Sequence, residues 1–155
     1  MKSGFYTTRG YEILNLSNNN LTSSMEDYLE MIYRHSRVDG YIRVNRLAQL
    51  LNVKDSSATK MIQKLGELQL INYEKYGYVT LTEQGREIGE WLLSRHETVE
   101  TFLKLIGCEN DILAQTELIE HVLNEDTLDK IKKLNSFFKK NEDIMIKYNS
   151  FKYTK

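Results

Sequence analysis

The strongest constraint on the fold is a pair of short helical patterns with only a tight turn between them. The first pattern is expected to begin at Asn45, a residue type that caps helices, and to end at Leu50. The second runs from about Ser56 to Leu68, and residues 52–55 supply the turn. The apolar positions that we expect to be buried are Leu47, Ala48 and Leu51 in the first helix, and Ala58, Met61, Ile62 and Leu65 in the second. Two short helices joined in this way predict a helix-turn-helix.

The segments on either side extend this motif to a winged helix. A preceding helix is expected to begin near Thr22 or Ser23, because Ser23 followed by Glu26 is a capping-box pattern, and to end before Gly40. Its buried face is expected to hold Met25, Tyr28, Leu29, Ile32 and Tyr33. After the helix pair, two β-rich runs at 70–75 and 78–82 surround a glycine and predict a hairpin, which would be the wing.

The rest of the chain is helical by pattern. A long helix is expected from Thr82 to about Gly107, followed by helical segments at roughly 110–123 and 125–148, and the sequence contains no proline. The predicted fold is therefore mainly α, a winged helix-turn-helix domain followed by an all-helical domain. We place these domains at 21–91 and 92–155, after an N-terminal extension at 1–20 to which no function is assigned.

Composition is typical of a soluble protein, with 41% hydrophobic and 28% charged residues. No apolar run approaches the roughly 18 to 20 residues that a membrane span needs, and the N-terminus lacks the pattern of a secretory signal. The single cysteine, Cys108, cannot form an intramolecular disulfide. We therefore expect a cytoplasmic protein with no membrane partner.

Basic residues are concentrated around the predicted helix-turn-helix. The net charge of the chain is only -1. Between positions 43 and 64, however, the local net charge is +4, because there is one acid, Asp55, and five basic residues, Arg43, Arg46, Lys54, Lys60 and Lys64. In a winged helix the second helix of the motif enters the major groove of DNA. The residues expected to contact double-stranded DNA are Arg43, Ser56, Ser57, Thr59, Lys60, Gln63 and Lys64, with Lys75 and Tyr76 on the wing. The alternatives are a solvated helix face and a wing that only covers the core.

Possible metal ligands recur at helical spacing. Asp27 and Glu30 lie three residues apart on the first helix, and Glu117, Glu120 and His121 follow the i, i+3, i+4 pattern on a later one. The long helix adds His96, whereas His35 has no partner at ligand spacing and is interpreted as structural. Carboxylates with imidazoles and no thiolate suit Mn²⁺ better than a cysteine-rich zinc site. The alternative for each pattern alone is a solvated acidic face.

Several motifs together resemble the diphtheria-toxin-repressor family, and within it the branch of manganese transport regulators. The resemblance runs from about Leu21 to Leu123. It rests on SMEDYLEMIY (24–33), IRVNRLAQLLNV (42–53), SSATKMIQKL (56–65), NYEKY (72–76), LTEQGREIG (81–89), RHETVETFL (95–103) and ELIEH (117–121), which occur in the family's order. Two positions depart from the family: Asp55 replaces a common proline, and the wing reads Tyr-Gly-Tyr where an arginine is usual.

The resemblance implies a function and a set of ligands. It implies that Asp27, Glu30, His96, Glu117, Glu120 and His121 form a site for two Mn²⁺ ions per subunit, with Fe²⁺, Co²⁺, Cd²⁺ or Zn²⁺ as other possible activators. Iron-responsive members place Met at the position of Asp27 and Cys at that of Glu117, so this ligand set favours manganese. The resemblance further implies a homodimer joined by its C-terminal helices, which binds a palindromic operator and represses metal-uptake genes. The SH3-like third domain of longer members is not expected.

Two other functions remain open from the sequence. Carboxylate and histidine sites between helices also occur in dinuclear metalloenzymes. The sequence offers no separate general base and no pocket for an organic substrate, so we expect no enzymatic activity. The second alternative is a winged-helix regulator that acts without a metal.

Overall fold

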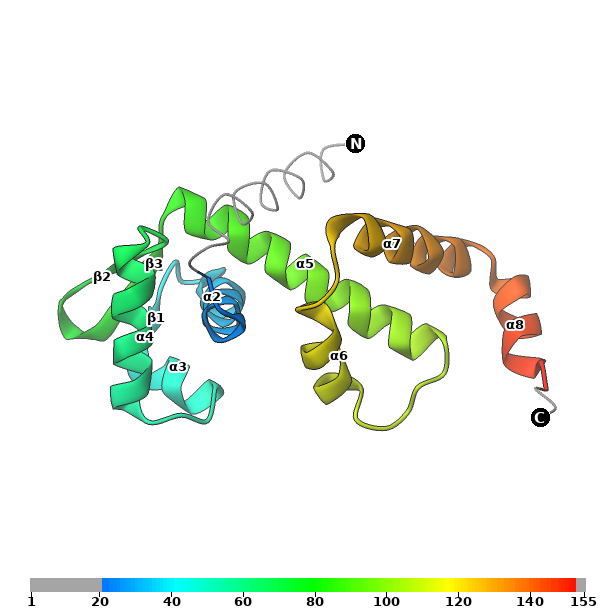
Figure 1. Cartoon of the computed structure of the whole chain (residues 1–155), viewed down its shortest axis with the longest axis horizontal. Helices are drawn as coiled ribbons and strands as arrows, with labels where there is room; N and C mark the ends of the chain where they lie inside the picture. The colour runs from blue at the N-terminus through cyan, green and yellow to red at the C-terminus, as the bar shows by residue number, and fades with distance from the viewer. Residues whose placement is uncertain (1–20, 153–155) are drawn as a thin grey trace. The chain divides into compact units, whose positions relative to one another are not determined.

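The computed structural model describes residues 21–152, which form parts of two compact units, Met1–Ser94 and Arg95–Lys155. The N-terminal extension expected at 1–20 lies outside the described residues. The long helix α5 (Glu83–Leu105) contributes its first half to one unit and its second half to the other (Figure 1). The two units are described separately below.

The first unit is a winged helix-turn-helix, which confirms the predicted fold of this part (Figure 1). A three-stranded antiparallel sheet has the order β1-β3-β2, and β3 pairs with both other strands. The hairpin of β2 and β3 is the wing. In chain order the elements are α2 (Ser23–Ser36), β1 (Ile42–Arg43), α3 (Val44–Leu50), α4 (Asp55–Glu67), β2 (Ile71–Tyr73), the 3-10 turn η1 (Lys75–Gly77), β3 (Tyr78–Leu81) and the start of α5.

The core of the first unit is built from one face of each helix and the inner face of the sheet. Its buried side chains include Leu29, Ile32, Leu47, Ala58, Ile62, Leu65, Val79, Ile88 and Trp91. Three predicted core positions, Tyr33, Leu51 and Met61, are only half-buried. The start of α5 approaches the rest of the unit closely, because Gly85 and Gly89 have no side chain. A Cβ at Gly85 would lie 1.8 Å from the Leu70 carbonyl oxygen, and one at Gly89 would lie 2.6 Å from the Cβ of Tyr33.

Two predicted helix caps are wrong. The side chain that caps α2 is Thr22, whose Oγ1 accepts a hydrogen bond from the Met25 N–H at 3.3 Å, and not Ser23. Helix α3 begins at Val44 after Arg43, so Asn45 lies inside the helix and does not cap it. The reason is that β1 runs directly into α3: Arg43 still pairs with Tyr78 in the sheet, and the helix begins at the next residue.

The second unit is helical, as predicted, and contains α6 (Ile112–Glu120), α7 (Glu125–Lys140) and α8 (Glu142–Ser150) after the end of α5. The segment predicted to be helical at 125–148 forms two helices, because the chain breaks at Asn141, whose φ of -129° and ψ of 73° are not helical. The Asn141 side-chain N–H donates to the Phe137 carbonyl at 2.7 Å. This bond gives a donor to one of the last carbonyls of α7, which lack a partner within the helix. In the described part of the chain, no helix is long and apolar enough to cross a membrane.

Helices α5 and α7 of the second unit are joined by a buried polar contact. The Asn135 side-chain N–H donates to the Thr98 carbonyl at 2.9 Å, and both residues are at least nine-tenths buried. Val99, Leu103 and Leu128 supply buried apolar side chains on the same helices. This packing fixes the part of α5 that carries a predicted metal ligand, His96.

Candidate metal centre and DNA-binding surface

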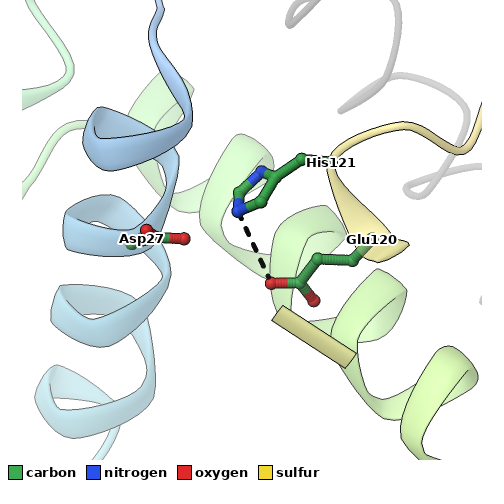
Figure 2. A group of neighbouring side chains, drawn as sticks. All are labelled: Asp27, Glu120 and His121. Carbon is green, nitrogen blue, oxygen red and sulfur yellow. Dashed lines mark ion pairs between the residues drawn. The ribbon is translucent and has the colours of Figure 1, made fainter. Parts of the chain in front are cut away.

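Three predicted metal ligands come together within the second unit. His96 lies on α5, Glu120 is the last residue of α6, and His121 follows it. The His96 Nδ1 and Glu120 Oε2 atoms are 3.0 Å apart, and these residues are only 4% and 1% exposed. Figure 2 marks a second ion pair, in which His121 Nε2 and Glu120 Oε1 are separated by 3.9 Å. Glu120 therefore lies between two imidazoles.

Glu117 takes a different position from its two neighbours in the motif. The buried residues of α6 are Thr116 and Glu120, four positions apart, so one face of the helix points inward. Glu117 follows Thr116 by one residue, about 100° further around the helix, and its side chain is exposed. Among the residues the structure describes, the groups of possible metal ligands do not include Glu117. The i, i+3, i+4 spacing thus predicted one face with three ligands, whereas the structure buries Glu120 and leaves Glu117 exposed.

Arg95 is a buried residue that the sequence analysis did not assign to the site. It is 4% exposed, and its Nη2 lies 3.2 Å from His121 Nδ1. Burying a guanidinium is costly unless it is paired. A basic residue among the apolar positions of α5 could therefore have indicated a buried polar site at Arg95. Its position next to His96 places a cation beside the same group of ligands.

The two ligands predicted on the first helix lie one turn apart on α2. Glu30 is 8% exposed and forms an ion pair with Arg34, four residues further along the helix. Asp27 is half-buried, and Figure 2 labels it on this helix. The i, i+3 spacing places both carboxylates on one face of α2.

The chemistry of the donors fits a hard divalent cation. Carboxylate oxygens and imidazole nitrogens are the available ligand atoms, and such a set suits Mn²⁺ and similar ions. The single cysteine, Cys108, is half-buried and belongs to neither group of possible ligands among the described residues. Glu120 and Glu30 are also buried carboxylates, and a divalent ion would add positive charge beside the partners that they already have.

The outer face of α4 carries the predicted DNA-contacting residues. Ser56, Ser57, Lys60, Gln63 and Lys64 are all exposed, while Ala58, Ile62 and Leu65 face the core. Thr59 differs, because it is half-buried and its hydroxyl donates to the Asp55 carbonyl at 2.9 Å. Five hydrogen-bonding side chains, two of them cationic, are thus available on the helix that would enter the major groove.

The predicted wing residues are also exposed. Tyr76 is 91% exposed at the tip and has a φ of 68°, and Gly77 follows with a φ of 79°. Two consecutive left-handed residues make the tight turn that fits the twist of a hairpin. A hollow of about 290 Å³ separates the wing from the start of α4. Its lining residues are Arg43, Val44, Asn45, Asp55, Thr59, Tyr73, Tyr76 and Gly77.

Comparison with known families gives two consecutive matches. Residues 20–79 match the model described as the iron dependent repressor, N-terminal DNA binding domain. Residues 82–146 match the iron dependent repressor, metal binding and dimerisation domain. The first match covers the winged helix, which carries the predicted DNA contacts. The second match contains the candidate metal ligands His96, Glu120 and His121.

Individual relatives agree with these matches. The chain is 46% identical over 119 residues to the HTH-type transcriptional regulator MntR of Oceanobacillus iheyensis, covering 76% of this chain and 81% of the relative. It is 46% identical over 122 residues to the regulator of the same name from Geobacillus kaustophilus, covering 78% and 86%.

Solved structures show the same fold. The structure titled manganese regulator SloR matches with a TM-score of 0.65 and 25% identity, covering 73% of this chain and 54% of that one. The T. acidophilum IdeR matches with a TM-score of 0.63 and 25% identity, covering 70% and 52%. The chain thus spans about half the length of these two structures.

Proposed function

The chain belongs to the iron-dependent repressor family, and because of this membership we propose that manganese is its activating metal. This is the family, also called the diphtheria-toxin-repressor family, that its sequence motifs resemble. The chain is a metal-dependent transcriptional repressor with a DNA-binding and a metal-binding domain. Relatives named MntR and a neighbour titled a manganese regulator support manganese, as do the oxygen and imidazole donors. The observation that carries the proposal is the buried Glu120 between His96 and His121, inside the domain matched as metal-binding.

We propose that the ligand set comprises Asp27 and Glu30 of α2 with His96, Glu117, Glu120 and His121 of the second unit, and that it binds two ions per subunit. A bound ion supplies positive charge to carboxylates that otherwise repel one another. Ligands from both units would tie the reading helix α4 to the dimerisation domain. Such coupling is typically worth about 1 to 3 kcal/mol in DNA affinity.

The proposed active species is a cytoplasmic homodimer that binds a palindromic operator upstream of metal-uptake genes. Two α4 helices would enter successive major grooves, about 34 Å apart, so the distance between them decides whether the dimer fits its operator. The proposed DNA contacts are Arg43, Ser56, Ser57, Thr59, Lys60, Gln63, Lys64, Lys75 and Tyr76. We propose no catalytic activity, in keeping with relatives named as transcriptional regulators.

Fluorescence anisotropy of labelled DNA tests this function. The probes are duplexes from upstream of the chain's own gene and of the manganese-uptake genes of the same genome, at fixed salt and with Mn²⁺, Fe²⁺ or Zn²⁺. We expect Mn²⁺ to strengthen binding by at least about fivefold, the lower end of typical allosteric coupling. Glu120→Gln and His121→Ala should abolish this stimulation, because each removes a proposed ligand.

The matched control is Glu142→Gln, which neutralises an exposed glutamate of α8. It should respond to Mn²⁺ as the natural chain does. Operator binding that is independent of metal, and indifferent to Glu120→Gln, would instead identify a regulator that acts without a metal. Hydrolysis of phosphoesters in the presence of Mn²⁺, without metal-stimulated DNA binding, would identify a metalloenzyme.

A further inference from the structure

The base of the wing holds a cluster of three side chains, and the proposed function gives a role only to one of them, Arg43. Arg43 on β1 and Tyr78 on β3 are directly opposite each other in the antiparallel ladder. Their chain neighbours Ile42 and Val79 are buried, so Arg43 and Tyr78 project from the outer face of the sheet. Tyr41 completes the cluster from the residue before β1.

Tyr78 holds the Arg43 guanidinium in two ways. The Arg43 Nη2–H donates to the Tyr78 hydroxyl at 2.6 Å, and the guanidinium carbon lies 4.8 Å from the centre of the Tyr78 ring. The second distance is within the range of a cation–π contact. The Tyr41 ring meets the Tyr78 ring edge-on at 4.8 Å between centres and 70° between planes, which supports Tyr78 in turn.

The guanidinium keeps most of its binding capacity. Arginine has five N–H donors in a planar fork, and the Tyr78 hydroxyl accepts from one nitrogen. Within residues 21–152, no carboxylate forms an ion pair with Arg43. A fixed, exposed guanidinium without a carboxylate partner is suited to a phosphate, which accepts two hydrogen bonds from the fork.

The surroundings of Arg43 also suit the backbone of DNA. Arg43 lines the hollow of about 290 Å³ that lies between the start of α4 and the wing, together with Thr59 and Tyr76. With α4 in the major groove, this hollow would face the sugar-phosphate backbone that borders the groove on the side of the wing. Asp55 lines the same hollow and opposes an anion there, so the positive charge of Arg43 is needed at this position.

We propose that Arg43 contacts a DNA phosphate and that Tyr78, supported by Tyr41, is the residue that positions it. This inference rests on the proposed function, because it assumes that the winged helix binds duplex DNA. The contact carries charge and no base recognition, so it should act on any sequence. Tyr78 acts only through Arg43.

The test compares Arg43→Gln, Tyr78→Phe and the double variant in the full chain with Mn²⁺. Anisotropy is measured over a range of salt on two duplexes, the upstream duplex described above and an unrelated duplex of the same length. Arg43→Gln should weaken binding to both by at least about tenfold, the lower limit for a charge-assisted hydrogen bond. The slope of log affinity against log salt should fall by about two for the dimer, about 0.9 for each lost phosphate contact.

Tyr78→Phe removes the hydroxyl and keeps the ring, so it should weaken binding by about three- to tenfold, as expected for one neutral hydrogen bond. In the Arg43→Gln background the same change should have no further effect, because Tyr78 has nothing left to position. An exposed arginine over another tyrosine ring, Arg37 at 5.9 Å from the centre of Tyr33, provides the control Arg37→Gln, which should leave affinity and salt slope unchanged.

Each of the following outcomes would overturn the proposal. An unchanged salt slope in Arg43→Gln would show that Arg43 contacts no phosphate. If Tyr78→Phe weakened DNA binding equally in the natural chain and in Arg43→Gln, Tyr78 would have a purely structural role. In that case Tyr78→Phe should also lower the melting temperature. If the natural chain bound neither duplex with Mn²⁺, the function itself would fail, whereas normal wild-type binding with unaffected variants would remove only the phosphate contact.

Discussion

Four of the proposed ligands, Glu30, His96, Glu120 and His121, have described polar partners inside the protein. Glu30 pairs with Arg34, Glu120 with His96, and Arg95 lies against His121. Burying a lone carboxylate costs several kcal/mol, so these neighbours compensate part of the charge. A metal ion must therefore compete with internal partners, which favours an ion that offers two positive charges to several ligands at once.

At the residue scale, His35 gives a prediction about acid stability. Burial, and then the charges of Arg34 and Arg46, lower its pKa from the ordinary 6.5. The unfolded chain therefore binds a proton at higher pH than the folded chain. The resulting stability is present above about pH 6.5 and is lost as the pH falls through the lowered pKa of the folded state.

Replacing His35 by Gln should remove this dependence. Urea unfolding at a series of pH values should show a shallower fall in the free energy of unfolding below about pH 6.5 for the variant than for the natural chain. His96 and His121 are present in both proteins, so the comparison isolates the effect of position 35. Identical pH profiles for the two chains would contradict the prediction.

At the level of elements, the sequence predicts the winged helix well because its signals are local. The turn at 52–55 and the glycine of the wing lie within a few residues of the helices and strands that they terminate. The break at Asn141 was missed for the opposite reason. No glycine or proline interrupts 125–150, and the apolar spacing continues through it, so a local pattern favours one helix. Asn141 ends α7 through a bond to the Phe137 carbonyl instead.

The candidate site could be predicted only in part from the sequence. Spacing along single helices identified Glu120 with His121, but it could not show that Glu117 is exposed, since that depends on which face of α6 packs inward. The contacts of Arg95 with His121 and of Tyr78 with Arg43 were not predicted, because they join residues 26 and 35 positions apart. Contacts at such separations depend on strand register and helix packing rather than on a sequence pattern.

The space around two glycines, one of them where α5 meets the turn between α4 and β2, predicts opposite effects of alanine substitutions. Gly85→Ala would place a Cβ against the Leu70 carbonyl oxygen, and the backbone must shift. We expect a loss of at least about 2 kcal/mol in the free energy of unfolding, in the range of overpacked cores. Gly66 in α4 has open space around it, so Gly66→Ala should stabilise by about 0.5 to 1 kcal/mol. Urea denaturation of both variants checks this, and equal effects would contradict it.

On the scale of the whole molecule, charge is divided unevenly. The chain as a whole carries -1, so its overall field does not draw it to DNA. The cations of α4 and the wing must supply that attraction locally. Each bound divalent ion adds two positive charges, so metal binding shifts the balance of the molecule in the direction that favours DNA.

Metal should also stabilise the fold. A ligand that binds only the folded state adds about 2.7 kcal/mol at a hundredfold excess over its dissociation constant. Thermal unfolding in Mn²⁺ should therefore occur at a higher temperature than in EDTA. Mg²⁺ at the same concentration controls for ionic strength, and Glu120→Gln should lose the Mn²⁺ effect. Equal melting temperatures in Mn²⁺ and Mg²⁺ would contradict the proposed site.

Trp91 gives this protein an internal optical reporter. It is the one tryptophan of the chain, it is 2% exposed, and it belongs to the unit that ends at Ser94. Its emission will shift to longer wavelength when solvent reaches the indole, so opening of the DNA-reading half can be followed without a dye. Substitutions at the proposed ligands of the second unit can then be screened for their effect on Trp91, using unlabelled protein and a single excitation wavelength.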